Sequence, residues 1–271
     1  MKLSATVVTY RPDIAVLRRS VESLAAAVSR AKETGVVSEA VLYVVDNGPA
    51  DALGPIAEAM KGFAQAGTLE ILHGHGNVGY GRANNLVLPR LDSDAHLVMN
   101  PDVELDRDAL VAALEELQVD SRIGAVAPAV RGPHGERQYL CKRYPSVWVL
   151  FLRGFAPSFI RNRFTATLGR YEMHDLAEER SAVPVPLASG CFMLMRTGIF
   201  KRVGGFDPRF FMYFEDYDLS LRIGRIAQVA YVPQARIVHH GGEASRKGFR
   251  HVAWFVRSAW QFFGIHGWKL S

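Results

Sequence analysis

The sequence predicts an α/β fold with a mostly parallel sheet and helices on both faces, and two observations support this prediction. Short, apolar, β-branched runs alternate with helical segments through the first 130 residues, and a polar or glycine-rich turn follows most of the runs. Helical connections between strands favour parallel pairing, which brings those turns to the carboxyl edge of the sheet. Ligands bind at this edge in such folds.

The first half supplies five expected strands, at residues 3–9, 40–45, 68–72, 96–99 and 123–130. Helices are expected from Pro12-Asp13 to about Lys32, over 52–64, after the glycine-rich turn at 74–81, and over 106–118 with an acidic cap. Each of the first four strands is thus followed by a turn and a helix, as a parallel sheet requires.

The second half has no clear strand–helix period. Residues 131–183 are basic and aromatic, and residues 185–196 predict a strand or hairpin interrupted at Ser189-Gly190. A helix is expected over 215–225, two short strands over 228–239 around Pro233, and a basic helix over about 246–263. Because no repeat, low-complexity tract or linker is evident, we expect a single domain over 1–271.

The composition is ordinary for a globular protein, at 49% hydrophobic and 22% charged residues, which excludes extensive disorder. The net charge of +5 is uneven, because residues 131–170 hold eight basic side chains and one acid, and residues 236–271 hold six and one. This pattern favours a local partner over a coating of nucleic acid, and no nucleic-acid module accompanies it. We therefore expect no nucleic-acid partner.

The two cysteines, Cys141 and Cys191, exclude a disulfide scaffold and a cysteine-based zinc site. No apolar run approaches the ~20 residues that span a bilayer, and the first residues do not have the pattern of a signal peptide. We expect a cytoplasmic protein on these grounds.

The segment Gly74-His75-Gly76-Asn77-Val78-Gly79 matches the G-x-G-x-x-G pattern of dinucleotide-binding proteins. It follows the third expected strand rather than the first, so we interpret it as a tight turn whose glycines adopt positive φ. NAD binding is disfavoured.

Acidic residues follow two of the expected strands, as Asp46-Asn47-Gly48 and as Asn100-Pro101-Asp102. Either could simply form a turn or a helix cap. At the carboxyl ends of neighbouring parallel strands, however, both point into one crevice. A carboxylate there suits a hydrated Mg²⁺ or Mn²⁺ that bridges a diphosphate.

The segment 214–222 and the pair His239-His240 are further candidates. On a helix, Glu215 and Asp218 share a face with Arg222 and could form an ion-pair network, whereas Asp216 lies off that face. The two histidines end an apolar strand, so they point to opposite sides and only one can face a given site. A single histidine is more often structural than a ligand.

Seven motifs, taken in order, resemble those of the family 2 glycosyltransferases, which have the GT-A fold. They lie at residues 7–12, 45–48, 77–85, 99–103, 190–196, 204–207 and 214–219, so the resemblance covers residues 5–245. The forms Asn-x-Gly-x-Gly-x-x-Asn-Asn and Asn-Pro-Asp are most similar to the branch that uses dTDP-L-rhamnose. The resemblance implies a nucleotide-sugar-binding half (1–130), an acceptor-binding and catalytic half (131–245) and a basic amphipathic helix (246–271).

The resemblance also implies roles for single residues. The nucleoside would be held by Thr9, Tyr10, Arg11 and Asp46. The nucleotide sugar would further contact Asn77, Gly79, Arg82, Asn100 and Asp102. A Mg²⁺ or Mn²⁺ ion would be bound by Asp102 and His239, Asp216 would be the general base, and Glu215 would contact the sugar or acceptor. Asn100 replaces the first acid of the family's metal motif, which predicts weaker metal binding.

The implied reaction is an inverting transfer of L-rhamnose from dTDP-L-rhamnose to a glycan or polyprenyl-diphosphate-linked acceptor in cell-surface polysaccharide synthesis. A single displacement from a good leaving group needs one base, unlike a retaining hydrolase. Two alternatives stay open. One is a UDP-sugar-dependent family 2 transferase, galactofuranosyl or N-acetylglucosaminyl, and the other is a nucleotide-sugar-binding module without catalytic activity.

Aromatic residues recur at helical spacing between Tyr144 and Phe159 and again between Val252 and Phe263, with arginines beside both stripes. They could be ordinary core-facing helices. They could instead contact anionic headgroups, since an acceptor on a polyprenyl chain lies in a bilayer. The second reading predicts peripheral association with the inner face of the plasma membrane.

Overall fold

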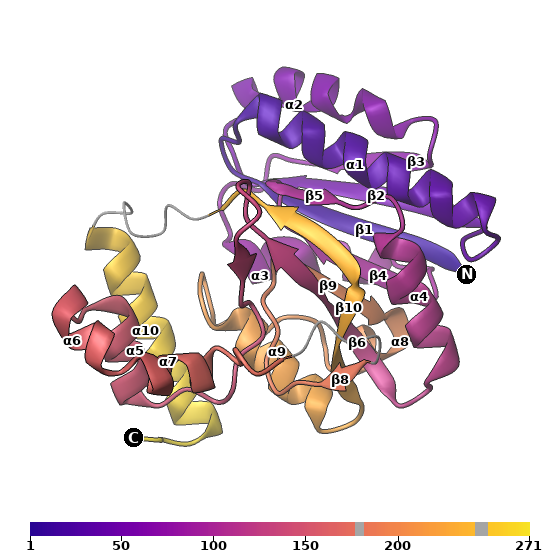
Figure 1. The fold of residues 1–271 in the computed structure, drawn as a ribbon. Helices are drawn as coiled ribbons and strands as arrows, with labels where there is room; N and C mark the ends of the chain where they lie inside the picture. Colours follow the sequence, from indigo (N-terminus) through magenta and orange to yellow (C-terminus); the bar gives the residue numbers. More distant parts are fainter. Residues whose placement is uncertain (177–181, 242–248) are drawn as a thin grey trace.

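The computed structural model describes residues 1–176, 182–241 and 249–271, and in these ranges ten strands form one central sheet (Figure 1). Across the sheet the order is β3 (Thr68–Leu72), β2 (Glu39–Asp46), β1 (Lys2–Thr9), β4 (Ala95–Met99), β9 (Phe192–Arg196), β6 (Ile123–Arg131), β10 (Gln228–His239) and β5 (Val103–Leu105). Two short strands pair beside this path, β7 (Arg137–Gln138) with β6 and β8 (Val183–Pro184) with β10.

Pairing is parallel from β3 to β4 and between β6 and β10. These strands are apolar on both faces because helices cover both, and seven of the eight residues of β1 are buried. Strand β9 runs antiparallel between β4 and β6. The predicted α/β fold is confirmed, and the carboxyl ends of β1, β2 and β4 lie together at one edge.

One face of the sheet is covered by α1 (Ile14–Glu33), α2 (Leu53–Met60) and α4 (Ala109–Val119), and the other by α3 (Tyr80–Asn85), α8 (Thr197–Arg202) and α9 (Glu215–Gly224). Asp13 caps α1 by accepting from the amides of Ala15 and Val16. Three short 3₁₀ turns connect elements, at Ala50–Ala52, Lys61–Phe63 and Leu88–Arg90.

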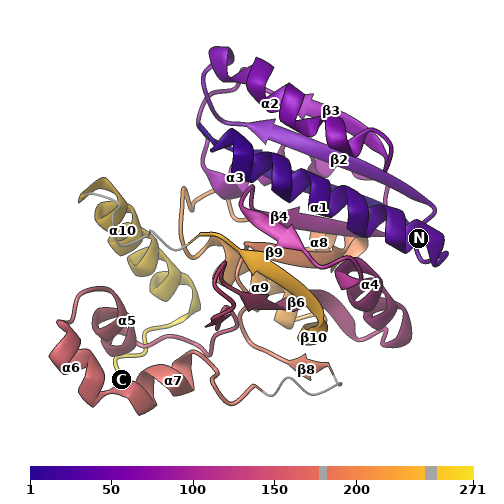
Figure 2. The same ribbon diagram turned by 45° about the horizontal axis from the view of Figure 1, so that its top comes forward.

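Beside the sheet, four helices form a separate cluster: α5 (Val147–Gly154), α6 (Ser158–Arg163), α7 (Thr165–Tyr171) and α10 (Phe249–His266) (Figures 1 and 2). An aromatic core joins α5 and α10 to the segment before α9, and its buried members are Leu150, Phe210, Phe214, Phe262 and Phe263. The C-terminal helix therefore packs with residues from the middle of the chain. Arg246 and Lys247, the first basic residues of the expected helix, lie outside the described residues.

Of the strand or hairpin expected over 185–196, the strand is confirmed as β9, which follows Ser189-Gly190 and pairs with β4 and β6 rather than forming a hairpin. Two other expectations on elements were wrong. Residues 228–239 form one strand rather than two, since a register shift between Val232 and Arg236 absorbs Pro233. Helix α4 begins at Ala109, and Asp108 at its N-cap makes no side-chain capping bond.

Candidate functional site

At the edge where β1 and β2 end, Thr9 lies opposite Asp46 in the ladder. The Thr9 hydroxyl and the Gly48 amide both donate to Oδ1 of Asp46, at 2.9 and 3.1 Å. The carboxylate is 1% exposed, and Oδ2 has no hydrogen-bond partner among the described residues. A buried acceptor left unpaired is costly unless a ligand supplies a donor. Asp46 is thus fixed through one oxygen and available through the other.

Tyr10 and Arg11 follow β1 at the same edge. Tyr10 is 54% exposed, and the Arg11 guanidinium lies 5.9 Å from the centre of its ring. Arg11 has a φ of 48°, a left-handed conformation that is unusual for a side chain of this size. This turn presents an aromatic face and a cation to solvent beside Asp46.

The glycine-rich turn is held against the same edge by side-chain amides. Asn47 donates to the carbonyl of Gly79 at 3.3 Å, and Nε2 of His75 lies 3.0 Å from Oδ1 of Asn47. Oδ1 of Asn77 accepts from the Gly79 amide at 3.0 Å. Gly79 has a φ of 89°, and a Cβ there would come within 2.4 Å of the Phe211 carbonyl oxygen. The turn is therefore built for glycine, with Asn77 shaping it.

Arg82 lies on a different side of α3. Its Nε donates to the carbonyl of Pro208 at 2.6 Å, and it lines a cavity of about 250 Å³ together with Arg209, Trp254 and Arg257. The structure therefore does not bring Arg82 into the cavity that Asp216 lines.

Asn100 and Asp102 follow β4, and the amide of Asn100 donates to the carbonyl of Cys191. Oδ1 of Asp102 lies 3.6 Å from Nε2 of His239 at the end of β10. Backbone pairing fixes this approach, because the His240 amide donates to the Asp102 carbonyl at 2.9 Å. His240 instead contacts Glu104, so the two histidines do point apart as predicted.

Gln138 orients the His239 ring. Its Nε2 donates to the His239 carbonyl at 3.0 Å, which leaves Oε1 to face the ring Nδ1, also at 3.0 Å. With Nδ1 donating to Gln138, Nε2 is the ring atom that faces Asp102. This is the arrangement by which a second side chain orients a histidine ligand.

Asp102 and His239 fit a divalent cation. Oδ1 of Asp102 lies 3.6 Å from Nε2 of His239, and in the part of the chain that the structure describes this oxygen is buried without a hydrogen-bond partner, which a bound cation would supply. A Cβ on Gly241 would lie 2.6 Å from Nε2 of His239, so glycine keeps the space open. No group of three His, Cys, Asp or Glu side chains is arranged around a metal position among the described residues. Other ligands would come from water or substrate.

Asp216 lies in the first turn of α9, after two residues with positive φ, Tyr213 and Phe214. Its Oδ2 accepts from the Gly190 amide and its Oδ1 from the Tyr217 amide, both at 2.9 Å. The Tyr80 hydroxyl donates to the Gly190 carbonyl at 2.7 Å and holds that loop. The carboxylate is therefore fixed by backbone donors from two segments.

Burial raises the pKa of both acids at this helix start. The pKa of Glu215 rises to about 8, through burial and then through the neighbouring charge of Asp216. Burial also raises the pKa of Asp216, but the Gly190 and Tyr217 amides oppose that rise. Oε2 of Glu215 has no hydrogen-bond partner within the described ranges. Asp216 is thus the acid better stabilised as an anion.

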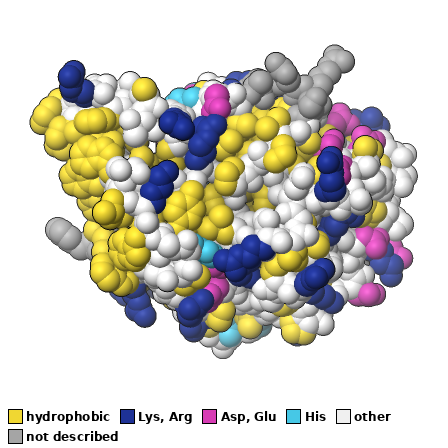
Figure 3. Space-filling model, turned by 90° about the horizontal axis from the view of Figure 1, so that it is seen from below, with side chains coloured by type: hydrophobic (Ala, Val, Ile, Leu, Met, Phe, Trp, Pro, Cys, Tyr) yellow, Lys and Arg dark blue, Asp and Glu magenta, His cyan; other side chains and the backbone are white. Residues whose placement is uncertain are grey.

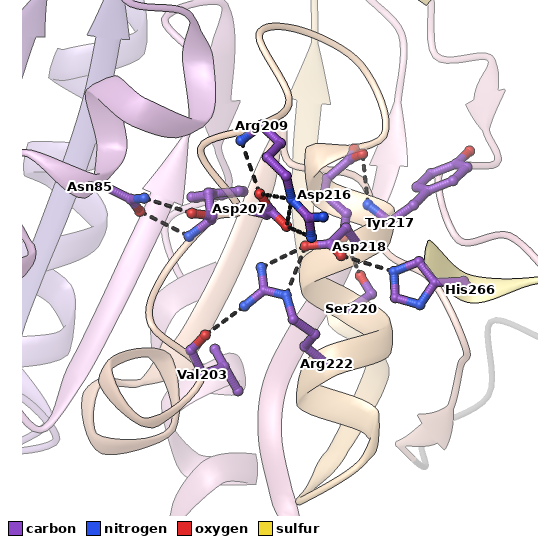
Figure 4. A network of polar contacts seen from close by, with 11 residues as sticks. Asn85, Val203, Asp207, Arg209, Asp216, Tyr217, Asp218, Ser220, Arg222 and His266 are labelled. Atoms are coloured by element: carbon purple, nitrogen blue, oxygen red, sulfur yellow. Dashed lines mark hydrogen bonds and ion pairs between the residues drawn. The ribbon is translucent and has the colours of Figure 1, made fainter. Parts of the chain in front are cut away.

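Asp218, unlike Asp216, forms ion pairs with other side chains of the protein (Figure 4). It is 1% exposed, pairs with Arg222 at 2.7 Å and lies 2.8 Å from Nε2 of His266 in α10. Arg222 also donates to the Val203 carbonyl. The predicted ion-pair network forms between Asp218 and Arg222, without Glu215, and it ties α9 to the helical cluster.

A cavity of about 550 Å³ lies between the start of α9 and the helical cluster. Asp216 and Glu215 line it, as do Lys142, Arg153 and Phe155. The cavity brings the predicted base together with cationic and apolar side chains from residues 140–155, which are distant from it in the sequence.

A family model described as glycosyl transferase family 2 matches residues 4–204. The chain belongs to this family. An N-acetylglucosaminyl-diphospho-decaprenol L-rhamnosyltransferase of Mycobacterium tuberculosis is 30% identical over 286 residues, which cover 98% of this chain and 86% of the relative. Rhamnosyltransferase WbbL of Escherichia coli K12 is 26% identical over 200 residues, which cover 69% of this chain and 70% of the relative. The predicted family is confirmed, as is the similarity to rhamnosyltransferases, and the chain is a glycosyltransferase.

Solved structures of glycosyltransferases share the fold. GalNAc-T7, determined with UDP, GalNAc and Mn²⁺, has a TM-score of 0.64 at 16% identity over 89% of this chain. The mannosyltransferase PcManGT of Pyrobaculum calidifontis, in complex with GDP-Man and Mn²⁺, has a TM-score of 0.60 at 16% identity over 95%. This chain spans 43% and 60% of those two proteins. The GT-A fold is confirmed.

The family 2 motifs did not single out several residues that the structure places at the site. Gln138 is distant in sequence from His239, and nothing in its neighbourhood identifies it. Lys142 and Arg153 line the cavity. In the sequence they are two of eight basic residues in the segment 131–170, and the charge of that segment does not distinguish them from the others. A role for Asn47 could have been predicted from sequence. It directly follows Asp46, and a buried side-chain amide needs a hydrogen-bond partner.

Proposed function

We propose that this glycosyltransferase moves L-rhamnose from dTDP-L-rhamnose to a glycan on a polyprenyl-diphosphate carrier, with inversion at the anomeric carbon and Asp216 as the base. The relative that is 30% identical over 98% of the chain is named for a rhamnosyl transfer of this kind. The observation that supports catalysis most directly is the Asp216 carboxylate, held by two backbone amides at a large cavity.

The donor would bind along the carboxyl edge of the sheet. The free Oδ2 of Asp46 suits the N3–H of a pyrimidine or a ribose hydroxyl, and Tyr10 offers a ring beside it. Asn77 and Gly79 shape the turn that faces the sugar nucleotide. In this proposal residues 1–130 bind the donor and residues 131–245 bind the acceptor.

The reaction is one displacement. The oxygen of an acceptor hydroxyl bonds to the anomeric carbon, the bond from that carbon to the diphosphate oxygen breaks, and the hydroxyl proton passes to Asp216. A base whose pKa is raised toward the working pH accepts a proton more effectively. The Gly190 and Tyr217 amides keep its carboxylate ionised and aligned, and the protonated Glu215 adds no second negative charge.

Asp102 and His239 would hold a Mg²⁺ or Mn²⁺ ion, whose charge stabilises the departing diphosphate. Asn100 contributes no charge, so the protein supplies one carboxylate and one imidazole. We expect modest metal affinity in the apoenzyme and tighter binding once a nucleotide diphosphate adds its oxygens.

The acceptor class supports a peripheral membrane contact. Exposed apolar residues gather on the helical cluster, which lies toward the left of Figure 3; they are Trp148, Phe151, Phe155, Phe159, Val252, Val256, Trp260, Trp268 and Leu270. We call this set the aromatic surface. Exposed cations adjoin it, namely Arg161, Arg163, Arg250, Arg257 and Lys269. None of the helices in the described ranges is long and apolar enough to cross a bilayer. An anionic lipid surface fits this combination.

Initial rates on a polyprenyl-diphosphate-linked N-acetylglucosamine test the proposal, with dTDP-L-rhamnose, UDP-N-acetylglucosamine and UDP-galactofuranose as donors. We expect turnover with dTDP-L-rhamnose and a product of inverted anomeric configuration by NMR. Asp216→Asn should lower kcat by about 10²–10⁴-fold while dTDP binding is kept. Asp120→Asn, at an exposed turn after α4, is the control. A preference for UDP-sugars, or wild-type turnover by the Asp216 variant, would overturn it.

Sedimentation with vesicles tests the membrane contact. Binding should require phosphatidylglycerol in phosphatidylcholine vesicles and should fall when Phe159 and Trp260, 74% and 70% exposed, become serine. Val119→Ser, at an exposed apolar residue that ends α4, should leave binding unchanged. Equal sedimentation of all variants would refute the assignment of this surface.

A further inference from the structure

Two cations share one carboxylate oxygen in the wall of the cavity beside Asp216. Nζ of Lys142 lies 3.2 Å and Nε of Arg153 lies 3.3 Å from Oε1 of Glu172. Nε2 of His174 lies 3.2 Å from the other Glu172 oxygen. Glu172 therefore supplies one negative charge to the two cations that it contacts, and the Asp216 carboxylate acts on Arg153 as a second, non-contacting negative charge.

The lysine that shares Glu172 is buried. Lys142 is 3% exposed, and its backbone is fixed by the bond from its amide to the Leu187 carbonyl. Burial and then the charge of Arg153 lower the Lys142 pKa to about 8. A buried charge that is only partly compensated is unfavourable, so a further anion would stabilise the cluster.

The cavity also combines three kinds of surface. Asp216 supplies a base, Lys142 and Arg153 supply charge, and Leu150, Phe155 and Phe255 supply apolar walls. Phe155 is 47% exposed and belongs to the aromatic surface, so the cavity is continuous with it. A hydroxyl, a diphosphate and a hydrocarbon chain are the matching parts of a lipid-linked acceptor.

We propose that Lys142 and Arg153 bind the diphosphate of the acceptor, with its first isoprene units against Leu150, Phe155 and Phe255. The assignment rests on the proposed function for the acceptor's identity. Each phosphate oxygen would take a charge-assisted hydrogen bond from a cation that Glu172 now holds in place. The donor also carries a diphosphate, so the test must separate the two sources.

Binding of farnesyl diphosphate to the whole chain, measured by calorimetry without donor or turnover, tests the assignment. Lys142→Met and Arg153→Met should each weaken binding about tenfold or more. Farnesol, which lacks the charge, should bind weakly to all variants. Arg170→Met removes an exposed cation of the same basic segment, in the last turn of α7 and outside the cavity, and should change little. The affinity for dTDP should stay the same throughout.

For Glu172→Gln we expect tighter binding of farnesyl diphosphate, in contrast to the two methionine variants. A misfolded protein could not show such a gain, so this variant separates a binding effect from a loss of folding. Removing the internal carboxylate frees both cations, so farnesyl diphosphate should bind more tightly than to the wild type. Tighter binding by this variant together with the losses above supports the proposal. Unchanged binding in the Lys142 and Arg153 variants, weaker binding in the Glu172 variant, or a loss of dTDP affinity instead would overturn it. This test measures binding and not transfer. If the protein does not transfer rhamnose, the binding results therefore still support or contradict the assignment of Lys142 and Arg153.

Discussion

Replacing Glu215 with glutamine should change how the stability of the protein depends on pH. The folded-state pKa of Glu215 is raised from 4.5 to about 8 by burial and then by Asp216. Between these two values the folded protein keeps a proton that the unfolded chain has released, so the wild type loses stability as pH rises. Below pH 4.5 the protonated Glu215 makes its full contribution to the unfolding free energy, and above about pH 8 this contribution is completely lost. Glutamine at this position has no such proton.

The size of the effect follows from the shift. A rise from 4.5 to about 8 corresponds to about 5 kcal/mol, at about 1.4 kcal/mol per pH unit. For a chain of this length that is a change in Tm of roughly 10 °C or more. Thermal unfolding of both proteins from pH 4 to 9 measures it, and the wild-type Tm should fall relative to Glu215→Gln as pH increases. Parallel curves would refute the claim that Glu215 is neutral in the folded protein.

Three further changes test other parts of the site. Gln138→Leu should weaken Mn²⁺ affinity about 10–100-fold in a titration with dTDP present, because the imidazole ligand loses its orienting partner, and equal affinity would contradict this role. Gly79→Ala should cost about 3 kcal/mol or more of unfolding free energy, given its φ of 89° and a Cβ contact of 2.4 Å, whereas Gly54→Ala, with open space around it, should not destabilise. Asp46→Asn should weaken the binding of dTDP about tenfold, as measured by calorimetry, and undiminished binding would exclude Oδ2 of Asp46 as a nucleoside contact.

The first 130 residues of the fold could be predicted from sequence because their signals are local. Each strand of β1 to β4 is a short apolar run with its own turn, and parallel connections bring the turn residues together without further information. Thr9 and Asp46 therefore meet as the strand pattern implies. The pairing of Asp102 with His239 was implied only by the family resemblance, and the structure places the two side chains together.

What could not be predicted depends on pairing between distant segments. Nothing within residues 192–196 indicates that this strand inserts between β4 and β6, and nothing near Pro233 indicates a register shift instead of a break. Arg82 shares a motif with Gly79, yet helical geometry turns it toward another cavity. The clustering of Lys142 with Glu172 joins residues thirty positions apart, with the helices α5, α6 and α7 between them. Such contacts follow from packing, which no local pattern encodes.

The order of strands in the sheet determines when the donor site can form during synthesis. Strand β6 borders only β9 and β10 in the main path of the sheet, and both strands come from beyond residue 190. When residue 131 has just been made, β4 and β6 are not yet joined, and each has an open edge that could pair with other chains. Residue 239 must also emerge before Asp102 gains its histidine partner. Residues 1–130 are therefore not a module that can be cut out, because strands from beyond residue 190 complete the sheet to which they belong.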